Sequence, residues 1–279
     1  MTGSLAAAVG KAWRNPQGRT GIVILGLLLM FAVFGPLLLP DPAALGLDAI
    51  SAAPGAGHPF GTDRLGRDIL ARVATGARIS LSIAAIAVAL SLTIGTAVGM
   101  IAATGGPAID RLLMRFVDAA LAVPRLFVLL LLLAVWERIP VGALILVIGA
   151  TGWLGTSRLV RGEALRLREE GYLQAARALG GGRSRAIFRH LLPNVAGVVL
   201  VSATLAIGDV ILLEAGLSYL GIGVQPPTPS WGAMVLAGKD SMTTAWWEMF
   251  FPGVAVVITV LAIGLVSDAL RAAFDPRSA

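Results

Sequence analysis

The sequence contains no cysteine and only two histidines, His58 and His190, among its 279 residues. The missing thiols exclude disulfides, thiolate metal sites and cysteine nucleophiles. Two histidines cannot form a multi-histidine metal site, and neither one has an evident partner set in the sequence. We therefore expect both histidines to be structural and expect no metal on this chain.

A phosphate-binding loop of the form G-x-x-x-x-G-K-[ST] is also missing. The chain has two lysines, Lys11 and Lys239, and each follows a glycine. Neither lysine has the earlier glycine or the following hydroxyl residue that the loop requires. A nucleophile elbow is incomplete at Ser157, because Leu159 stands where its second glycine should be. The sequence predicts a chain that is not an enzyme and has no cofactor of its own.

Charged residues are scarce: they make up 14% of the chain, against about 25% in a typical soluble domain. Hydrophobic residues make up 57%, and the mean hydropathy is strongly positive. These values indicate an all-α integral membrane protein. The net charge of +6 is therefore to be interpreted by its location relative to the membrane, and it does not indicate a nucleic-acid partner.

Long apolar runs predict six transmembrane helices, since about 20 helical residues cross the hydrocarbon layer. In the second run, Gly95 and Gly99 form a GxxxG pair that permits close helix approach, although chance is an alternative in a glycine-rich chain. The third run contains Asp118, expected at the headgroups, and Arg125, expected to snorkel or to face a cavity. The predicted spans are 21–39, 79–103, 117–136, 140–157, 195–213 and 249–267.

Lysine and arginine counts predict the orientation. With the N-terminus in the cytoplasm, sixteen of these residues fall in cytoplasmic segments and six in external ones. Cytoplasmic loops are the lysine- and arginine-rich ones, so both termini are expected to be cytoplasmic. The first external loop carries four arginines, and we expect Asp63 and Asp68 to pair with two of them.

Residues 163–194 form a polar interval that is expected on the cytoplasmic side. Apolar residues recur there at Leu165, Tyr172, Ala176 and Leu179, which is one face of a helix. A short helix with one apolar stripe fits docking into the groove of another protein. A helix lying on lipid, with its arginines on anionic headgroups, explains the same pattern.

The external segment that follows the fifth run is rich in proline and tryptophan. We expect it to fold back against the spans as a plug or partly re-entrant element, and to act as a gate or as a contact for an external protein; packing against a partner chain is the alternative. Asp209 in the fifth run is a candidate pathway residue, because ionisable groups within spans are functional candidates by default. The gate or contact residues are Glu214, Ser218, Pro226, Pro227 and Trp231.

Three stretches together resemble the C-type permeases of the ABC importers for peptides and nickel. The first resembles the cytoplasmic EAA loop, and the other two resemble external segments of that family. The matching residues are Gln174-Ala175-Ala176, Gly180 and Leu192-Pro193; Gly61-Thr62-Asp63, Gly66-Arg67-Asp68, Arg72, Gly76, Arg78 and Ser80; and Glu214-Ala215, Leu217-Ser218, Leu220-Gly221, Gly223, Pro226-Pro227 and Pro229-Ser230-Trp231-Gly232.

The resemblance implies a type I ABC importer permease fold with a cytoplasmic coupling helix, in the inner membrane. It implies four kinds of partner: a paralogous permease, two cytoplasmic ATPases that hold the ATP and Mg²⁺, an extracytoplasmic solute-binding protein, and membrane lipid. Transport of peptides, nickel chelates or glutathione is then expected. The implied docking residues are Glu163, Glu170, Tyr172, Gln174, Ala175, Ala176, Arg177, Leu179 and Gly180.

Three positions depart from the family pattern: Gln174 replaces a glutamate, Tyr219 a phenylalanine and Ala71 a serine. An ion pair made by that glutamate would be lost here. An ion-coupled secondary transporter is the alternative function, but such carriers contain inverted repeats that this sequence does not display. We divide the chain into a cytoplasmic N-terminus (1–20), a first helix with its external loop (21–77), a five-helix permease core (78–271) and a cytoplasmic tail (272–279).

Overall fold

The computed structural model describes residues 5–173 and 182–274, and every regular element in these two ranges is helical. The elements are α1 (Leu5–Arg14), α2 (Pro16–Leu38), η1 (Leu47–Ala49), α3 (Ile69–Gly105), α4 (Pro107–Leu121), α5 (Arg125–Leu133), α6 (Val141–Arg168), α8 (Arg183–Arg185), the π-helical η2 (Ala186–Leu191), α9 (Leu192–Tyr219), α10 (Trp231–Gly238), η3 (Lys239–Ser241) and α11 (Trp247–Phe274).

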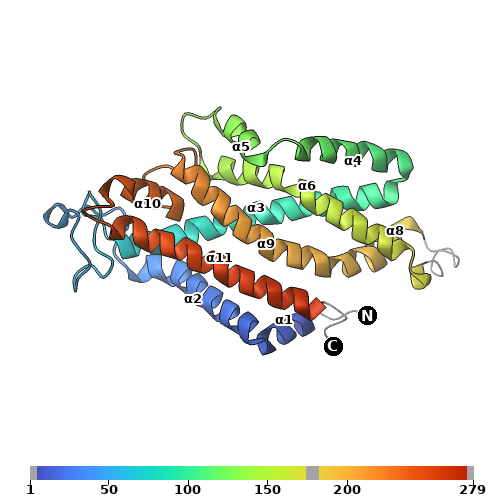
Figure 1. Cartoon of the computed structure of the whole chain (residues 1–279), viewed down its shortest axis with the longest axis horizontal. Helices are drawn as coiled ribbons and strands as arrows, with labels where there is room; N and C mark the ends of the chain where they lie inside the picture. Colours follow the sequence, from blue (N-terminus) through green and yellow to red (C-terminus); the bar gives the residue numbers. More distant parts are fainter. Residues whose placement is uncertain (1–4, 174–181, 275–279) are drawn as a thin grey trace.

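The long helices lie side by side along the long axis of the molecule (Figure 1). Among the described residues, five helices are long and apolar enough to cross a membrane: α2, α3, α6, the continuous η2–α9 helix and α11. The α4–α5 pair would make a sixth span. This confirms the predicted all-α fold with up to six spans.

Polar residues at the helix starts explain several of the boundaries. The side chain of Asn15 accepts a hydrogen bond from the backbone of the first turn of α2, and Pro16 begins that helix. Asp68 caps α3 and Ser230 caps α10 in the same way. These caps satisfy backbone N–H groups that have no partner within the helix.

The third predicted span is not one straight helix. α4 and α5 meet at an angle of 82°, and the break falls at residues 122–124. Pro124 lacks a backbone N–H, and it disfavours helical geometry at Val123 before it. The prediction of a continuous helix over 117–136 was therefore wrong, because the apolar composition continues through a proline that ends the hydrogen-bond ladder.

The long helices extend beyond the predicted apolar runs, and the extensions of α3 and α6 matter most for the site. α3 has 37 residues and begins at Ile69, ten positions before the predicted run 79–103. α6 continues beyond residue 157 to Arg168. Its 28 residues span about 42 Å, which exceeds the hydrocarbon thickness of about 30 Å. The last turns of α6 therefore extend out of the apolar layer.

α3 and α6 pack closely against each other at the two glycines of the GxxxG pair. A Cβ on Gly95 would lie 2.7 Å from the Cβ of Thr156, and one on Gly99 would lie 2.6 Å from the backbone oxygen of Ser157. The prediction of a close helix approach is confirmed, because only glycine fits at this separation.

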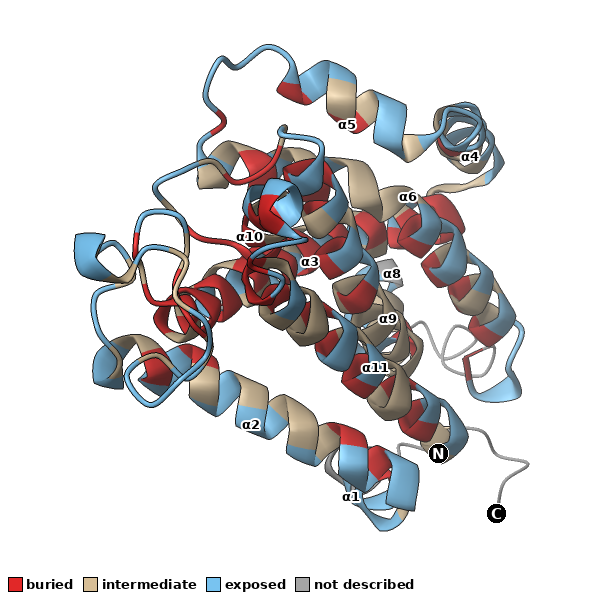
Figure 2. Cartoon of the chain, turned by 60° about the vertical axis from the view of Figure 1, so that its left-hand side comes forward, coloured by how far each residue is buried: buried red, intermediate tan, exposed pale blue. Residues whose placement is uncertain are grey.

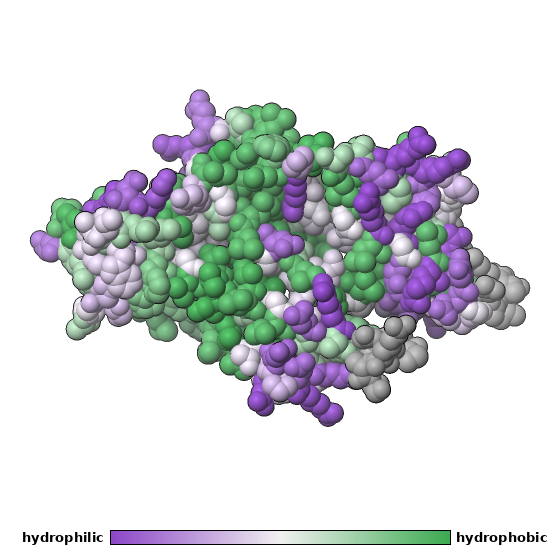
Figure 3. Space-filling model, in the orientation of Figure 1, coloured by the Kyte–Doolittle hydropathy of each residue, from purple (hydrophilic) through white to green (hydrophobic). Residues whose placement is uncertain are grey.

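Buried side chains of the described residues form one large cluster and two smaller ones. Figure 2 colours the buried residues red along the helices. On the face shown in Figure 3, the middle of the molecule is mostly apolar, whereas polar residues gather toward its two ends. We call the end with residues 40–68 and 220–246 the loop end, and the end with both termini and α8 the terminal end (Figure 1). This distribution is that of a bundle whose middle faces lipid or other apolar chains.

Candidate functional site

At the terminal end, a small apolar cluster joins the last turns of α6 to the start of α9. Leu167 and Leu173 contribute from one side, and Leu191 and Val195 from the other. Leu173 is fully buried and its neighbour Tyr172 is 47% exposed. The two flanks of the predicted docking segment are therefore held in place by α3, α6 and α9.

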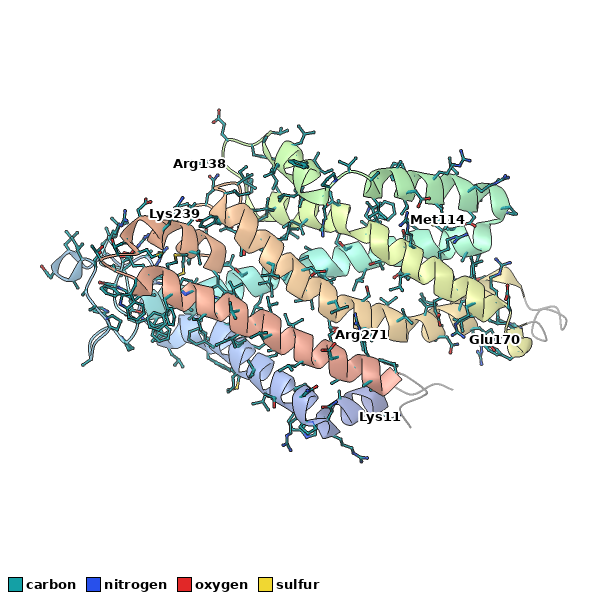
Figure 4. All side chains as sticks on the ribbon, viewed as in Figure 1. Lys11, Met114, Arg138, Glu170, Lys239 and Arg271 are labelled. Atoms are coloured by element: carbon teal, nitrogen blue, oxygen red, sulfur yellow. The ribbon has the colours of Figure 1, made fainter. Side chains whose placement is uncertain are left out.

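The charged residues on this flank pair with one another. Arg166 donates from Nη2 to Glu163, at 2.6 Å, and from Nη1 to Glu170, at 3.2 Å. Figure 4 labels Glu170 near the far tip of the terminal end. The aromatic rings of Tyr172 and His190 lie 6.3 Å apart. Tyr172 is thus exposed beside a local ion-pair network.

Most of the predicted docking residues lie outside the described residues, and their role stays a prediction. They are Gln174, Ala175, Ala176, Arg177, Leu179 and Gly180.

At the loop end, residues 40–68 are held by acidic side chains. Asp63 accepts a hydrogen bond from Nε of Arg67 at 2.7 Å and lies 3.6 Å from Nε of Arg72. Asp68 lies 2.8 Å from Nδ1 of His58 while it caps α3. Asp63 therefore pairs with two arginines by itself. The prediction that Asp68 pairs with an arginine was wrong, because its carboxylate contacts His58 and accepts a hydrogen bond from the first turn of α3.

A buried carboxyl group connects three elements at the loop end. Glu214, on α9, is 1% exposed. It accepts hydrogen bonds from Oγ of Ser80 on α3, at 3.0 Å, and from Oγ of Ser218, at 2.7 Å. Ser80 also accepts from the backbone N–H of Trp231, at 3.3 Å, and Ser218 from that of Val224, at 3.0 Å. This network fixes α10 and the loop before it against α3 and α9.

A second buried carboxyl group connects the other loops. Glu248, at the start of α11, accepts hydrogen bonds from Oγ of Ser241 at 2.8 Å and from Oγ of Ser51 at 3.3 Å. Nε1 of Trp247 donates to the backbone oxygen of Thr62 at 3.0 Å. The long loop over residues 40–68 is therefore attached to α11.

The structure separates the predicted gate or contact residues into two groups. Glu214, Ser218 and Trp231 are buried, and Trp231 donates from Nε1 to the backbone oxygen of Val73 at 3.1 Å. Pro226 and Pro227 are exposed and joined by a cis peptide bond. Of these five residues, the two prolines are exposed, while the other three are buried and hold the segment against the spans.

Sequence reasoning missed several partners because they are distant in the chain. Ser80 and Glu214 are 134 positions apart, and no local pattern joins them. Asp118 was expected at the headgroups, and it pairs with Arg158 at an exposed position. Asp110 forms a two-bonded ion pair with Arg161 that was not predicted. Arg125 donates a hydrogen bond to the backbone oxygen of Ile148 on α6, a partner that the sequence did not indicate.

The fold and its two polar ends define a polytopic, all-helical membrane protein. The chain belongs to the family described as the binding-protein-dependent transport system inner membrane component, which matches residues 95–279. It is thus a permease subunit of an ABC transporter in the inner membrane, and ATP hydrolysis is carried out by separate subunits. The alternative of an ion-coupled carrier is not favoured by these relationships.

Several relatives are similar over nearly the whole chain. A protein named as a peptide permease in Brucella suis is 41% identical over 280 residues, which cover 99% of this chain and 92% of the relative. The oligopeptide transport system permease protein OppC of Bacillus subtilis is 39% identical, with 94% and 86% covered. The dipeptide transport system permease protein DppC of Bacillus subtilis is 36% identical, with 95% and 85% covered.

Proposed function

We propose that this chain is a permease subunit for peptides. The similarity to proteins named as peptide, oligopeptide and dipeptide permeases, over 85% or more of their lengths, carries this proposal. Nickel chelates and glutathione are the other substrates that the external segments suggested. The test is competition for uptake of a labelled dipeptide: unlabelled di- and tripeptides should compete, whereas competition only by a nickel chelate or glutathione would replace the peptide assignment.

The permease works in an assembly with a paralogous second permease and two ATPases. The ATPases dock on residues 163–190 and supply the energy of transport through ATP and Mg²⁺ that they bind themselves. Two features of the described flank support this role: α6 extends past the apolar layer, and Tyr172 is exposed next to the fully buried Leu173. An exposed aromatic residue on a rigid support suits an interface anchor.

Both termini and the docking segment lie in the cytoplasm. The excess of basic residues supports this orientation, because sixteen lysines and arginines belong to the segments assigned to the cytoplasm and six to the external ones. Lys11 and Arg271, from the larger group, are at the terminal end, whereas Arg138 and Lys239, from the smaller group, lie toward the loop end (Figure 4). The loop end is then external, and the solute-binding protein approaches there. The exposed Pro226 and Pro227 are its nearest candidates for contact in the predicted segment.

Cross-linking tests the docking assignment. Because the chain has no cysteine, Tyr172→Cys introduces a single thiol, and a bifunctional reagent should join it to an ATPase subunit in membranes. The matched control is Lys239→Cys at the loop end, which should give no such product. Cross-linking from position 239 and none from position 172 would reverse the proposed orientation.

A further inference from the structure

A cavity of about 410 Å³ lies beside the bend between α4 and α5, against the first half of α6. Its walls are almost entirely apolar, apart from one guanidinium group and one hydroxyl. Small-molecule sites are commonly apolar cavities of this size with a few polar groups that fix the orientation of the ligand. The residues that define it best are Phe116, Ala120, Val123, Arg125, Thr151 and Trp153.

Arg125 supplies the guanidinium group. It donates from Nη2 to the backbone oxygen of Ile148 at 2.7 Å and from Nε to Oγ1 of Thr151 at 3.4 Å. Its Nη1 makes no hydrogen bond to any described residue, and no described carboxylate lies within ion-pair distance of Arg125. A half-buried cation in apolar walls is costly unless an anion is supplied. The cavity is therefore built to receive an anion.

Asp209 on α9 is the acidic group that interacts electrostatically with Arg125. Asp209 forms no ion pair with a described residue. Asp209 is ten residues before the end of α9, or about 15 Å along the helix. Thr151, the bonding partner of Arg125, is ten residues after the start of the neighbouring α6, a similar distance along its helix. Asp209 is exposed and is not among the residues that line the cavity. An acidic group outside the cavity thus acts on an incompletely bonded cation in the cavity wall.

We propose that these two residues form a mid-membrane subsite for a zwitterionic peptide. The C-terminal carboxylate binds Arg125, the N-terminal ammonium faces Asp209, and an apolar C-terminal side chain enters the cavity beside the stacked rings of Phe116 and Trp153. The inference rests on the proposed peptide function and deepens it. It assigns to the permease a selection for free peptide termini, in addition to any selection made by the binding protein.

The test compares two forms of one substrate in the assembled transporter. Alanyl-phenylalanine and its C-terminal amide are each supplied at concentrations that saturate the binding protein, and initial uptake into proteoliposomes is measured. Arg125→Gln should lower uptake of the free acid by about tenfold and leave uptake of the amide within about twofold of wild type, because only the acid loses a charge-assisted hydrogen bond. Arg125→Lys should restore part of the loss. The matched control Arg138→Gln, at an exposed position outside the cavity, should change neither rate.

The outcomes separate this subsite from the proposed function. If the wild-type assembly moves no peptide, the function itself is wrong. If it moves peptides but Arg125→Gln slows both forms equally, or neither, Arg125 is only structural and the subsite is refuted.

A thiol on the cavity wall gives a second measurement that does not depend on rates. Ala120→Cys introduces a single thiol, and the free-acid peptide should protect it from a water-soluble thiol reagent during turnover, whereas the amide should not. A thiol that the reagent never reaches would show that lipid or the second permease fills the cavity, which would overturn the proposal.

Discussion

Substitution of Gly99 by alanine tests the close α3–α6 contact that organises the bundle. The new Cβ would lie 2.6 Å from the backbone oxygen of Ser157 and 2.8 Å from the Cβ of Val160. Neither atom belongs to a flexible side-chain tip, so the helices must move apart. Overpacking of this kind costs about 1–3 kcal/mol, and the better helix propensity of alanine returns up to about 1 kcal/mol. We expect a net loss of about 1–2 kcal/mol.

Gly95→Ala should behave similarly, since its Cβ would lie 2.7 Å from the Cβ of Thr156. One displacement of α6 relieves both clashes, so the double variant should lose less stability than the sum of the single variants. The matched control is Gly162→Ala on α6, where an added Cβ would meet no described atom within 4 Å. Unfolding in mixed detergent micelles, followed by tryptophan fluorescence, measures each change. A Gly99→Ala protein as stable as wild type, or a control as unstable as Gly99→Ala, would refute the reasoning.

Three further predictions concern the polar contacts. Glu214→Ala should destabilise the chain by about 2–4 kcal/mol in the same unfolding assay, because the Ser80 hydroxyl loses its buried acceptor. Glu214→Gln keeps an acceptor and should cost clearly less. Equal losses for the two variants would contradict the hydrogen-bond network. Trp247→Phe removes the hydrogen bond to Thr62, worth about 1 kcal/mol, and should speed limited proteolysis within residues 40–68; an unchanged cleavage rate would show that other contacts hold the loop. Asp118→Asn breaks an exposed ion pair and should stay within about 1 kcal/mol of wild type, so a larger loss would indicate a buried role.

The apolar runs predicted most of the long helices because a membrane span requires an uninterrupted apolar sequence of known length. They failed at residues 122–124, where the composition stays apolar while the backbone turns by 82°. They also ended the fourth span at residue 157, whereas α6 continues to Arg168. Its last turns carry Glu163 and Arg166, which form an ion pair on the helix surface. A search for apolar runs does not detect helical turns that consist of charged residues.

The candidate sites were predictable only in part. The expectation that the segment after the fifth run folds back against the spans agrees with the burial of Trp231, although residues 214–219 continue α9 instead of starting the loop. The hydrogen-bond partner Ser80 of Glu214 could not be predicted from the sequence, because Ser80 lies on a distant helix whose placement depends on the tertiary packing. Arg125 was expected to snorkel or to face a cavity, and it does border one, but the helix carbonyl that holds it could not be deduced from local sequence.

The central claim is that this permease moves peptides with energy supplied by other subunits. The most direct measurement is accumulation of a labelled dipeptide in proteoliposomes that contain this chain alone, the two permeases, or the complete assembly with both ATPases and the binding protein. The account predicts accumulation above the external concentration only in the complete assembly with ATP and Mg²⁺. Uphill accumulation by this chain alone would contradict it.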